Sequence, residues 1–527
     1  MKKFLALALA LIMVLSLFTA CGKKEEAAAP EASTDAPASS EKAESSTPSR
    51  DDVIVRCEQV WYNLHPLEGI VGFPNLYILD QAYEALTRID DEGTVQPRLA
   101  TEWEISEDAK EFTFKIREGV KFHNGEELKA SDVVFTYEVA METASCDVYL
   151  NKVTSVEAVD DYTVKITLAS PSVSFLNNTA EIYIMNEKYY NEVGGDMLEQ
   201  GCGTGPYKIV EVDLSTEIKL EAFDEYWECE VPIKTAIVRA VTDSTTAAVS
   251  FEAGELDFMQ VSNISAYAPL AEKEEFNTTL VTTLHTAYIA LNNEVAPFDN
   301  KLVRQALNYC MDRESMVAIA YEGLAEPAYL MADERAKGVD LTAAKEYTYD
   351  LEKAKALLAE AGYPDGINFS EDFGITFDII AGGYFEKFAQ VFQQSLAEIG
   401  CTIELRASET YSSDAATGNY SIVTQGMTFT YDFAYNEGLY GTTGINSKNH
   451  ARFSNERVDE LFLLGDSTTD EAERATYYKE LCDILADECP TLPVLHRQIP
   501  YAWAGDLNAV PHNAVNHPYY IYEWSWN

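Results

Sequence analysis

Alternation of apolar and polar residues predicts β-strands in the first half of the chain. This period-two pattern runs through Val53–Arg56, Phe112–Ile116 and Tyr162–Leu168, and residues 218–222 alternate in the same way. Successive side chains of a strand point to opposite faces. Each of these segments therefore predicts a strand with one buried face.

An apolar spacing of three to four residues predicts helices in the second half. Asp350 is a preferred N-cap, and Gly362 followed by Pro364 predicts the end of the helix that it starts. A second apolar stripe ends at Gly400, and an alternating strand over residues 402–406 follows at once. The two stripes consist of Leu351, Ala354, Leu357, Leu358 and Ala361, and of Phe388, Val391, Phe392, Leu396 and Ile399. Helix, glycine and strand in this order are typical of an α/β layer.

The N-terminus predicts export. Two lysines precede a run from Phe4 to Phe18 that is apolar except for Ser16, and at about 15 residues it is shorter than the roughly 20 needed to span a bilayer. Small residues then precede Cys21, and the segment resembles a bacterial lipoprotein signal, in which this cysteine is lipidated. We expect residues 1–20 to be the signal peptide and Cys21 to be the lipid attachment site. The alternative is ordinary secretion with Cys21 as a free thiol.

The next segment, residues 21–50, is predicted to be a disordered tether. Residues 22–50 are rich in Ala, Ser, Thr, Pro, Glu and Lys, and contain no Val, Ile, Leu, Met or aromatic residue. Such a segment cannot bury enough apolar surface to offset its ordering entropy. As a flexible chain it would span about 30 Å, which lets a globular body stay near a membrane partner.

Composition and charge narrow the classes of function. About 477 residues follow the tether, enough for two or three domains, and apolar residues make up 47% of the chain, so a substantial core is available. The formal net charge is −49. Because such a surface repels phosphate polymers, we expect no nucleic-acid partner. No second apolar run approaches the length of a membrane span, so the lipid is the expected contact with the membrane.

A search for chemical motifs finds no catalytic, metal or cofactor signature. HExxH, GxSxG and Walker A sequences are absent, and no cysteines form a CxxC pair. His512 and His517 lie five apart in a Pro- and Asn-rich stretch, which indicates a surface loop rather than a metal pair. GCGTGPY at residues 201–207 is followed by a strand, so a tight turn is a better interpretation than a phosphate loop. We expect no enzyme, no metal and no cofactor, with buried free thiols in the body, although pairing among distant cysteines is left open.

A combination of short segments carries a family signal. Residues 95–141 contain PRLATEW, TFKIREGVKFHNG and a helix that is expected to be capped at Ser131 and Asp132. Further matching segments are YEAL at 83–86, GTGPY at 203–207, FDEYW at 223–227, and residues 291–314, 354–366 and 453–462. Taken together and in this order, they resemble family 5 extracellular solute-binding proteins, the peptide-, dipeptide- and nickel-binding components of ABC importers.

The resemblance implies an α/β fold of the two-lobed, class II periplasmic-binding-protein type, with an extra subdomain in the first lobe. The expected segments are residues 51–89, 203–296 and 495–527 for lobe 1, residues 90–202 for the extra subdomain, and residues 297–494 for lobe 2. Crossings near Glu294–Phe298 and Val494–Ile499 would join the lobes. A ligand that contacts both lobes would shift the protein toward its closed form.

The resemblance also implies a position for the ligand. In peptide-binding relatives, a strand and loop of the second lobe pair with the ligand backbone, and an acidic residue receives the peptide amino group. In the corresponding residues 426–434, Tyr431 matches the family pattern, Met427 replaces a Trp, and Thr430 occupies the position of the acid. Asp432 lies two residues later, on the same side of an extended strand. We hypothesise that Asp432 replaces the missing acid; the alternative is a loop or capping residue without ligand contact.

Four other residues are weaker candidates for ligand contact. Phe429 would form an aromatic wall with Tyr431, unless it packs in the core. Asn63 and His65 lie in the loop after the first strand and would contribute from lobe 1. Arg452 would meet a ligand carboxylate, with a surface ion pair as the alternative.

The expected function follows from the resemblance and the signal. We expect a lipid-anchored, monomeric binding protein at the extracytoplasmic face of the cell membrane, which delivers small peptides or a related solute to ABC permease subunits. The alternatives are a ligand-sensing or pheromone receptor on the same scaffold, or binding of a nickel chelate or an oligosaccharide. Import and sensing need the same fold, lipid and cleft, so the chain alone does not separate them.

Overall fold

The computed structural model describes residues 50–71, 73–197, 201–512 and 517–527. The predicted signal peptide, Cys21 and nearly all of the predicted tether lie outside the described residues. The unit Ser49–Asn527 contains every hydrophobic cluster discussed below, so it has its own core and can fold by itself. No helix within these described ranges is long and apolar enough to cross a membrane.

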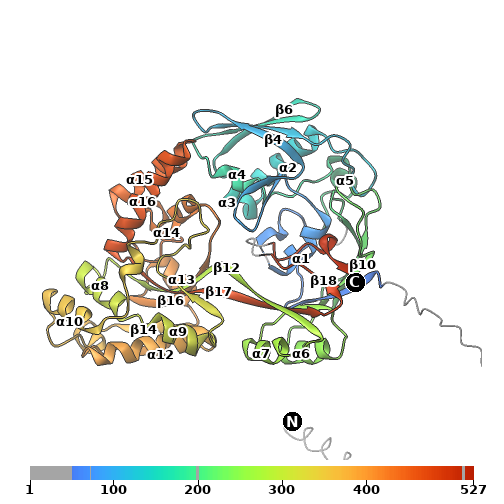
Figure 1. The fold of residues 1–527 in the computed structure, drawn as a ribbon. Coiled ribbons are helices and arrows are strands. Elements are labelled where there is room, and N and C mark those ends of the chain that lie inside the picture. The colour runs from blue at the N-terminus through green and yellow to red at the C-terminus, as the bar shows by residue number, and fades with distance from the viewer. Residues whose placement is uncertain (1–49, 72, 198–200, 513–516) are drawn as a thin grey trace, which may run out of the picture. The chain divides into compact units, whose positions relative to one another are not determined.

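One 11-stranded mixed sheet runs through both lobes (Figure 1). Its strand order is β15-β14-β16-β12-β17-β11-β1-β10-β9-β8, with β13 beside β17. Lobe 1 contributes β1 (Asp52–Cys57), β8 (Tyr207–Asp213), β9 (Glu217–Ala222), β10 (Thr235–Ala240) and β11 (Phe258–Gln260). Lobe 2 contributes β13 (Ala325–Pro327), β14 (Thr376–Ile379), β15 (Glu404–Ala407) and β16 (Ile422–Thr428). The predicted α/β clamshell is confirmed, and β1 and β9 confirm two of the predicted strands.

Two long strands cross between the lobes. β12 (Phe276–Leu291) pairs with β16 of lobe 2 through its C-terminal part, and β17 (Thr491–Ala504) pairs with β11 of lobe 1 near its C-terminal end. The two strands also pair with each other, with a register shift between Thr282 and Thr286. The first crossing therefore lies inside β12, earlier than the expected Glu294–Phe298. A single strand of 16 residues is long enough to belong to both sheets.

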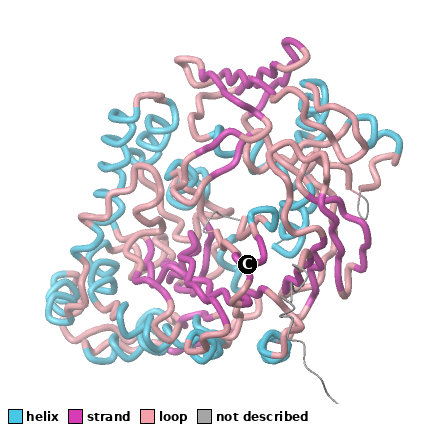
Figure 2. The backbone as a smooth tube through the Cα atoms, turned by 45° about the vertical axis from the view of Figure 1, so that its right-hand side comes forward, coloured by secondary structure: helices cyan, strands magenta, loops and turns pink. Residues whose placement is uncertain are grey.

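In lobe 2, the helices lie on the outer side of the strands and cover them (Figure 2). Asp350 caps α10 (Leu351–Glu360) by accepting a hydrogen bond from Lys353 N, and α12 (Gly383–Glu398) buries the second predicted stripe. β15 follows α12 after a glycine turn, so the predicted order of helix, glycine and strand is confirmed. The other longer helices of lobe 2 are α8 (Lys301–Tyr309), α9 (Arg313–Ala320), α13 (Tyr411–Thr417), α15 (Glu456–Ser467) and α16 (Glu471–Glu488).

The extra subdomain is an antiparallel sheet with helices on it. Its strand order is β4 (Ala100–Ile105), β5 (Glu111–Ile116), β7 (Thr163–Leu168) and β6 (Val153–Asp160), and α2 (Ala130–Met141) packs on β6 and β7. Its core continues onto α1 (Phe73–Ala82). Residues 201–207 form the predicted tight turn against the end of this helix. A Cβ on Gly203 would lie only 2.1 Å from the Ala82 carbonyl oxygen, so only glycine fits there.

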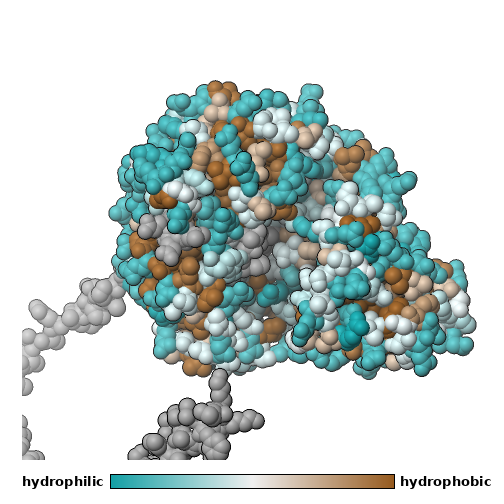
Figure 3. All heavy atoms as spheres, turned by 180° about the vertical axis from the view of Figure 1, so that it is seen from behind, coloured by the Kyte–Doolittle hydropathy of each residue, from teal (hydrophilic) through white to brown (hydrophobic). Residues whose placement is uncertain are grey.

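The surface and the cysteines agree with the composition. Hydrophilic residues predominate on the face seen in Figure 3, and hydrophobic residues occur there in small groups. All eight cysteines of the described residues are free, and seven of them are buried, Cys229 being the exposed one. Burial raises the pKa of the Cys57 thiol to about 12, so this thiol stays protonated and unreactive. The prediction of buried free thiols is confirmed for these seven.

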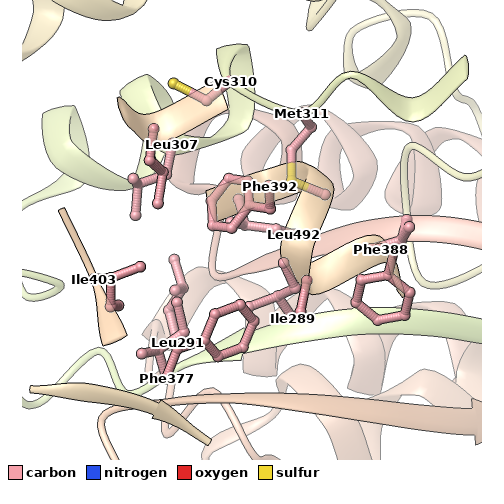
Figure 4. Close-up of a cluster of buried hydrophobic side chains, with 14 of the residues drawn as sticks. Ile289, Leu291, Leu307, Cys310, Met311, Phe377, Phe388, Phe392, Ile403 and Leu492 are labelled. Carbon is pink, nitrogen blue, oxygen red and sulfur yellow. The ribbon is translucent and has the colours of Figure 1, made fainter. Parts of the chain in front are cut away.

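A large cluster of buried side chains fixes the crossing strands in lobe 2 (Figure 4). Ile289 and Leu291 of β12 and Leu492 of β17 pack with Phe388 and Phe392 of α12. Because strand residues alternate, the opposite face of β12 packs in a second cluster, which also contains the residues that follow β16. Burial on both faces makes lobe 2 a rigid base for the loop that starts where β16 ends.

Candidate functional site: the cleft between the lobes

The cleft lies where strands of both lobes end. β1 runs parallel to β10 and β11 in lobe 1, and β16 runs parallel to β14 in lobe 2. In open α/β sheets, ligands bind outside the carboxyl ends of the strands. Residues 58–65 follow β1 and residues 429–434 follow β16, so both segments emerge at these edges. They contain all of the predicted site residues except Met427 and Arg452.

A cavity of about 500 Å³ lies beside the crossing strands, and we call it the hinge cavity. Its lining includes Asp91 from lobe 1, Thr282 and His496 from the crossing strands, and Glu326, Asp333, Arg335 and Lys345 from lobe 2. Arg335 pairs with Asp333 and donates hydrogen bonds to the carbonyl oxygens of Thr282 and Thr283, the latter at 3.0 Å. These bonds hold the guanidinium against β12, so the wall of the cavity carries fixed charges of both signs.

A second cavity of about 430 Å³, the distal cavity, lies between the extra subdomain and lobe 2. Its lining includes Lys152, Ser172, Asn177 and Asn178 from the subdomain, and Thr430, Asp432, Glu437, Lys448 and Asp466 from lobe 2. Hydroxyl, amide, ammonium and carboxylate groups thus face the same space. Such a lining suits a polar ligand that carries both hydrogen-bond donors and acceptors.

The predicted loop contributes to the lining of the distal cavity. Thr430 and Asp432 line the distal cavity together, on the same side, as the alternation predicted. Tyr431 points elsewhere: its ring lies against Gly93 of lobe 1, and burial raises its pKa, with the charges of Arg335 and Asp91 acting on its hydroxyl. The loop therefore makes contact with lobe 1 through Tyr431.

Phe429 and Met427 lie in the body of lobe 2. Phe429 is only 2% exposed and its side chain belongs to the lobe 2 core, so the core alternative describes its position. Met427 lies in β16 opposite Thr286 and packs on the same cluster. Neither residue lines the hinge or the distal cavity.

Asp432 has protein partners on both carboxylate oxygens. Its Oδ1 accepts hydrogen bonds from Ala434 N at 2.9 Å and from Arg474 Nη2 at 2.6 Å. Its Oδ2 accepts one from Asn177 Nδ2 of the extra subdomain at 3.4 Å. Burial lowers the pKa of Arg474, but the combined effects of Asp432, Tyr478 and Asp466 outweigh it, and the net direction is upward. Arg474 thus offsets the charge of Asp432, which also caps the short helix at Phe433–Asn436.

Asn63 and His65 build the loop that follows β1. The Asn63 side chain accepts a hydrogen bond from His65 N at 2.8 Å and donates one to Glu68 at 2.9 Å. The His65 ring accepts one from Leu67 N at 3.2 Å and stands edge-on to Tyr190. Burial lowers the pKa of His65, so the ring is neutral. Neither side chain lines the hinge or the distal cavity.

Arg452 forms an ion pair with Glu294 and donates a hydrogen bond to Asn446 Oδ1 at 2.8 Å. Glu294 is 53% exposed, so this is the surface pair that the sequence offered as an alternative. The pair connects the end of β12 to the loop before α15 and lies outside both cavities.

Glu58, directly after β1, is a candidate residue that the sequence reasoning missed, although it lines neither the hinge nor the distal cavity. Among the described residues, its buried Oε1 has no hydrogen-bond partner, while Oε2 accepts a bond from Tyr77 Oη at 3.3 Å. Burial raises the pKa of Glu58, and the nearby charges of Arg56 and Arg497 offset this in part. Arg497 belongs to the crossing strand β17 and donates to Tyr321 Oη of lobe 2. Glu58 is thus a buried acid with one oxygen free of hydrogen bonds among the described residues, at the edge of lobe 1 that faces the crossing strands.

Arg56 holds this edge in place. Its guanidinium donates to the carbonyl oxygens of Val241 at 3.0 Å and Gln260 at 2.6 Å, and to Ser262 Oγ at 2.8 Å. These groups lie at or just beyond the ends of β10 and β11, so Arg56 ties three strand ends together. The available sequence signal was the presence of two charged residues, Arg56 and Glu58, at the end of an otherwise apolar strand.

Two histidines of the crossing strands are neutral. His285 Nδ1 bonds to Thr428 Oγ1 at 3.1 Å, and His496 Nδ1 bonds to Thr286 Oγ1 at 2.9 Å. Burial lowers the pKa of each to about 4. Within the described part of the chain, no three His, Cys, Asp or Glu side chains are grouped so that they could hold a metal ion.

Known proteins resemble this chain over most of its length. Heme-binding protein A of Haemophilus influenzae is 31% identical over 465 residues, which cover 79% of this chain and 82% of that protein. The glutathione-binding protein GsiB of Shigella dysenteriae is 29% identical, covering 81% and 85%. The solved structure of HbpA2 from Haemophilus parasuis superposes with a TM-score of 0.81 at 26% identity, covering 90% of this chain and 100% of that one.

The family assignment rests on a match to a family model. The model of the family described as "Bacterial extracellular solute-binding proteins, family 5 Middle" matches residues 94–447. The match covers more than half of the chain and includes both sides of the cleft. The resemblance that the sequence showed is therefore confirmed: this chain belongs to the bacterial extracellular solute-binding proteins of family 5.

Proposed function

We propose that this protein captures a small peptide, or a solute with similar polar groups, between its lobes and delivers it to the membrane subunits of an ABC importer. Members of family 5 are binding proteins and not enzymes. The main support for this proposal is that residues of both lobes line the hinge cavity and the distal cavity. A ligand held in either cavity would bridge the lobes and stabilise the closed form by its differential contacts.

The charges of the cleft support a zwitterionic ligand. We propose that Glu58 offers an acidic group from lobe 1 with a free hydrogen-bonding oxygen, and Arg335 and Lys345 offer cations in the hinge cavity. We propose Thr430 and Asp432 as hydrogen-bonding contacts in the distal cavity. Since Arg474 already offsets its charge, Asp432 would accept a hydrogen bond rather than supply a net negative charge. Glutathione, for which GsiB is named, is a tripeptide with this combination of groups.

A thermal-unfolding screen against candidate solutes tests this proposal and identifies the ligand directly. Residues 49–527 are unfolded and refolded to remove captured solute, and then screened by thermal unfolding against dipeptides, tripeptides, glutathione and hemin. Hemin is included because the relative at 31% identity is named for heme. A ligand at 100 times its dissociation constant adds about 2.7 kcal/mol, which raises the melting temperature measurably. Native mass spectrometry of untreated protein gives an independent mass for the captured solute. If hemin stabilises the protein and no peptide does, the peptide proposal is wrong.

We further propose that Cys21 carries the lipid anchor and that residues 21–50 are the tether. The support is the basic, apolar and small-residue order that ends at Cys21. A Cys21→Ser variant is expected to move from the membrane fraction to the soluble fraction and to lose incorporation of labelled palmitate. Retention of the variant in the membrane fraction would contradict the anchor. Deletion of the protein with measurement of solute uptake separates import from sensing, because a sensor leaves uptake unchanged.

A further inference from the structure

The two lobes also meet at a point far from the crossing strands. The last turn of α15, in lobe 2, contacts the loop between β7 and α4 (Phe175–Asn178) of the extra subdomain (Figure 1). Asp466 lies at the centre of this contact and is 7% exposed. Its carboxylate accepts hydrogen bonds from Ser172 Oγ at 2.7 Å, Ser174 N at 3.0 Å and Lys152 Nζ at 2.9 Å. Its carbonyl oxygen accepts one from Val173 N at 2.8 Å.

Both sides of this contact are rigidly attached to their own lobes. Ser172 N bonds to Ala109 O at 3.0 Å, and Phe175 is buried in the subdomain core, where its ring meets Phe112 edge-on. On the other side, Gly465 packs so closely against Tyr478 of α16 that a Cβ there would lie 2.2 Å from that ring. The four bonds to Asp466 therefore cannot be kept while the lobes separate.

The contact is also connected to the distal cavity. Asp466, Lys152 and Ser172 all line that cavity. Arg474 donates to Gly465 O at 2.8 Å with its Nε and to Asp432 Oδ1 with its Nη2. A single guanidinium thus joins the residue next to Asp466 to the cavity-lining Asp432.

We propose that Asp466 is a latch between the extra subdomain and lobe 2. The latch favours the closed form through protein groups alone and slows the escape of solute from the distal cavity. The latch adds a closing contact to the proposed function. Only its effect on solute escape rests on that function. Because a charged acceptor strengthens its hydrogen bonds, loss of the carboxylate is expected to lower the ratio of closed to open protein about tenfold. The apparent dissociation constant of a solute rises as the competent fraction falls.

The test measures closure without any ligand. Small-angle X-ray scattering of residues 49–527 gives the radius of gyration of the protein and of its Asp466→Ala variant. Glu460→Ala is the matched control, because Glu460 lies on the same helix, is exposed and, among the described residues, forms its ion pair with Arg457 of that helix. Ser172→Ala weakens the latch from the subdomain side and leaves α15 intact. Circular dichroism checks that each variant is folded.

The latch predicts a larger radius of gyration for Asp466→Ala and Ser172→Ala than for wild type and Glu460→Ala. Equal radii for all four proteins would overturn it. If the latch variants open and yet no compound of the solute screen stabilises the wild type, the latch stands and the proposed function fails. If the wild type binds a solute and the variants keep its radius and its affinity, the proposed function stands and the latch fails.

Discussion

The ring of Tyr431 in lobe 2 lies directly on the backbone of Gly93 in lobe 1. Gly93 has a φ of +75° in the turn between β2 (Thr87–Ile89) and β3 (Val95–Pro97), and a Cβ at this position would lie 2.5 Å from the Tyr431 ring. The close approach of the two lobes at this point therefore requires a glycine. Tyr431, which matched the family pattern, therefore contacts lobe 1 and lines neither cavity.

A Gly93→Ala variant is expected to bind solute at least about tenfold more weakly, because its methyl group keeps the lobes apart. Isothermal titration with the solute found in the screen measures this change. Gly119→Ala is the control, since Gly119 has a φ of +78° and nothing lies within 4 Å of its added Cβ. A second exchange, Tyr431→Gly, should restore closure in the Gly93→Ala background, because it removes both the ring and the Cβ of Tyr431, each 2.5 Å from the added methyl group. Equal affinities for the Gly93→Ala and Gly119→Ala variants would contradict this role.

Removal of either partner of the Asp432–Arg474 pair is expected to destabilise the protein. The side chains are 5% and 11% exposed, so Asp432→Ala leaves a buried, uncompensated guanidinium. We expect a loss of about 3–5 kcal/mol in the free energy of unfolding, measured with urea. The double variant Asp432→Leu/Arg474→Met should lose less than either single variant. If Asp432→Ala were as stable as wild type and bound solute weakly, Asp432 would be a ligand contact without a structural role.

Glu58→Gln is expected to be more stable than wild type but to bind solute less well. Burial raises the pKa of Glu58, so the folded protein holds this proton more tightly than the unfolded chain. Stability then falls as the pH rises from the unfolded pKa of about 4.3 through the folded one. Glu58→Gln lacks this pH-dependent loss, and its free energy of unfolding is expected to be about 1 kcal/mol higher than that of wild type at neutral pH.

Urea unfolding between pH 4 and 8 measures the stability, and titration calorimetry measures the solute affinity. The exposed Glu102 of β4 provides the control variant Glu102→Gln. Unchanged solute affinity in Glu58→Gln would remove Glu58 from the site.

His512 is expected to make stability depend on pH in the alkaline range. Burial alone would lower its pKa, but hydrogen bonds to Asp91 at 3.1 Å and Glu523 at 2.8 Å raise it to about 9. A raised folded pKa gives stability that is fully present below the unfolded pKa of about 6.5 and is lost as the pH rises through the folded value. The loss is at most about 3 kcal/mol, at 1.36 kcal/mol for each pKa unit. Thermal unfolding of His512→Gln should lack this decline between pH 6.5 and 9, and a decline equal to that of wild type would refute the assignment.

Much of the fold could be predicted because its local signals are strong. The N-cap Asp350, the stripe of α12 and the alternation in β1 and β7 each describe a single element whose own residues decide its periodicity. The two crossing strands could not be predicted from a local pattern in the same way. β12 is half in each lobe, and its two halves face different surroundings, so no single pattern of polarity runs along it.

The site was predicted less well than the fold. The alternation placed Thr430 and Asp432 on one side, but it gave no information on Arg474, which lies 42 residues later and offsets the charge of Asp432. Glu58 looked like any acidic residue among the 87 acids of the chain. Its distinguishing property is the lack of a hydrogen-bond partner for Oε1 in its surroundings, and that depends on side chains from several distant elements.

The sequence by itself determined the family, the α/β class and the order of the main elements, because each is encoded in contiguous residues. The tertiary structure decided which charges are neutralised and where the lobes touch. Asp466 and Ser172 are 294 residues apart in the chain and yet share a hydrogen bond of 2.7 Å. Such contacts arise only when separate segments fold and pack, since no local pattern specifies the partner of a polar side chain across a cleft.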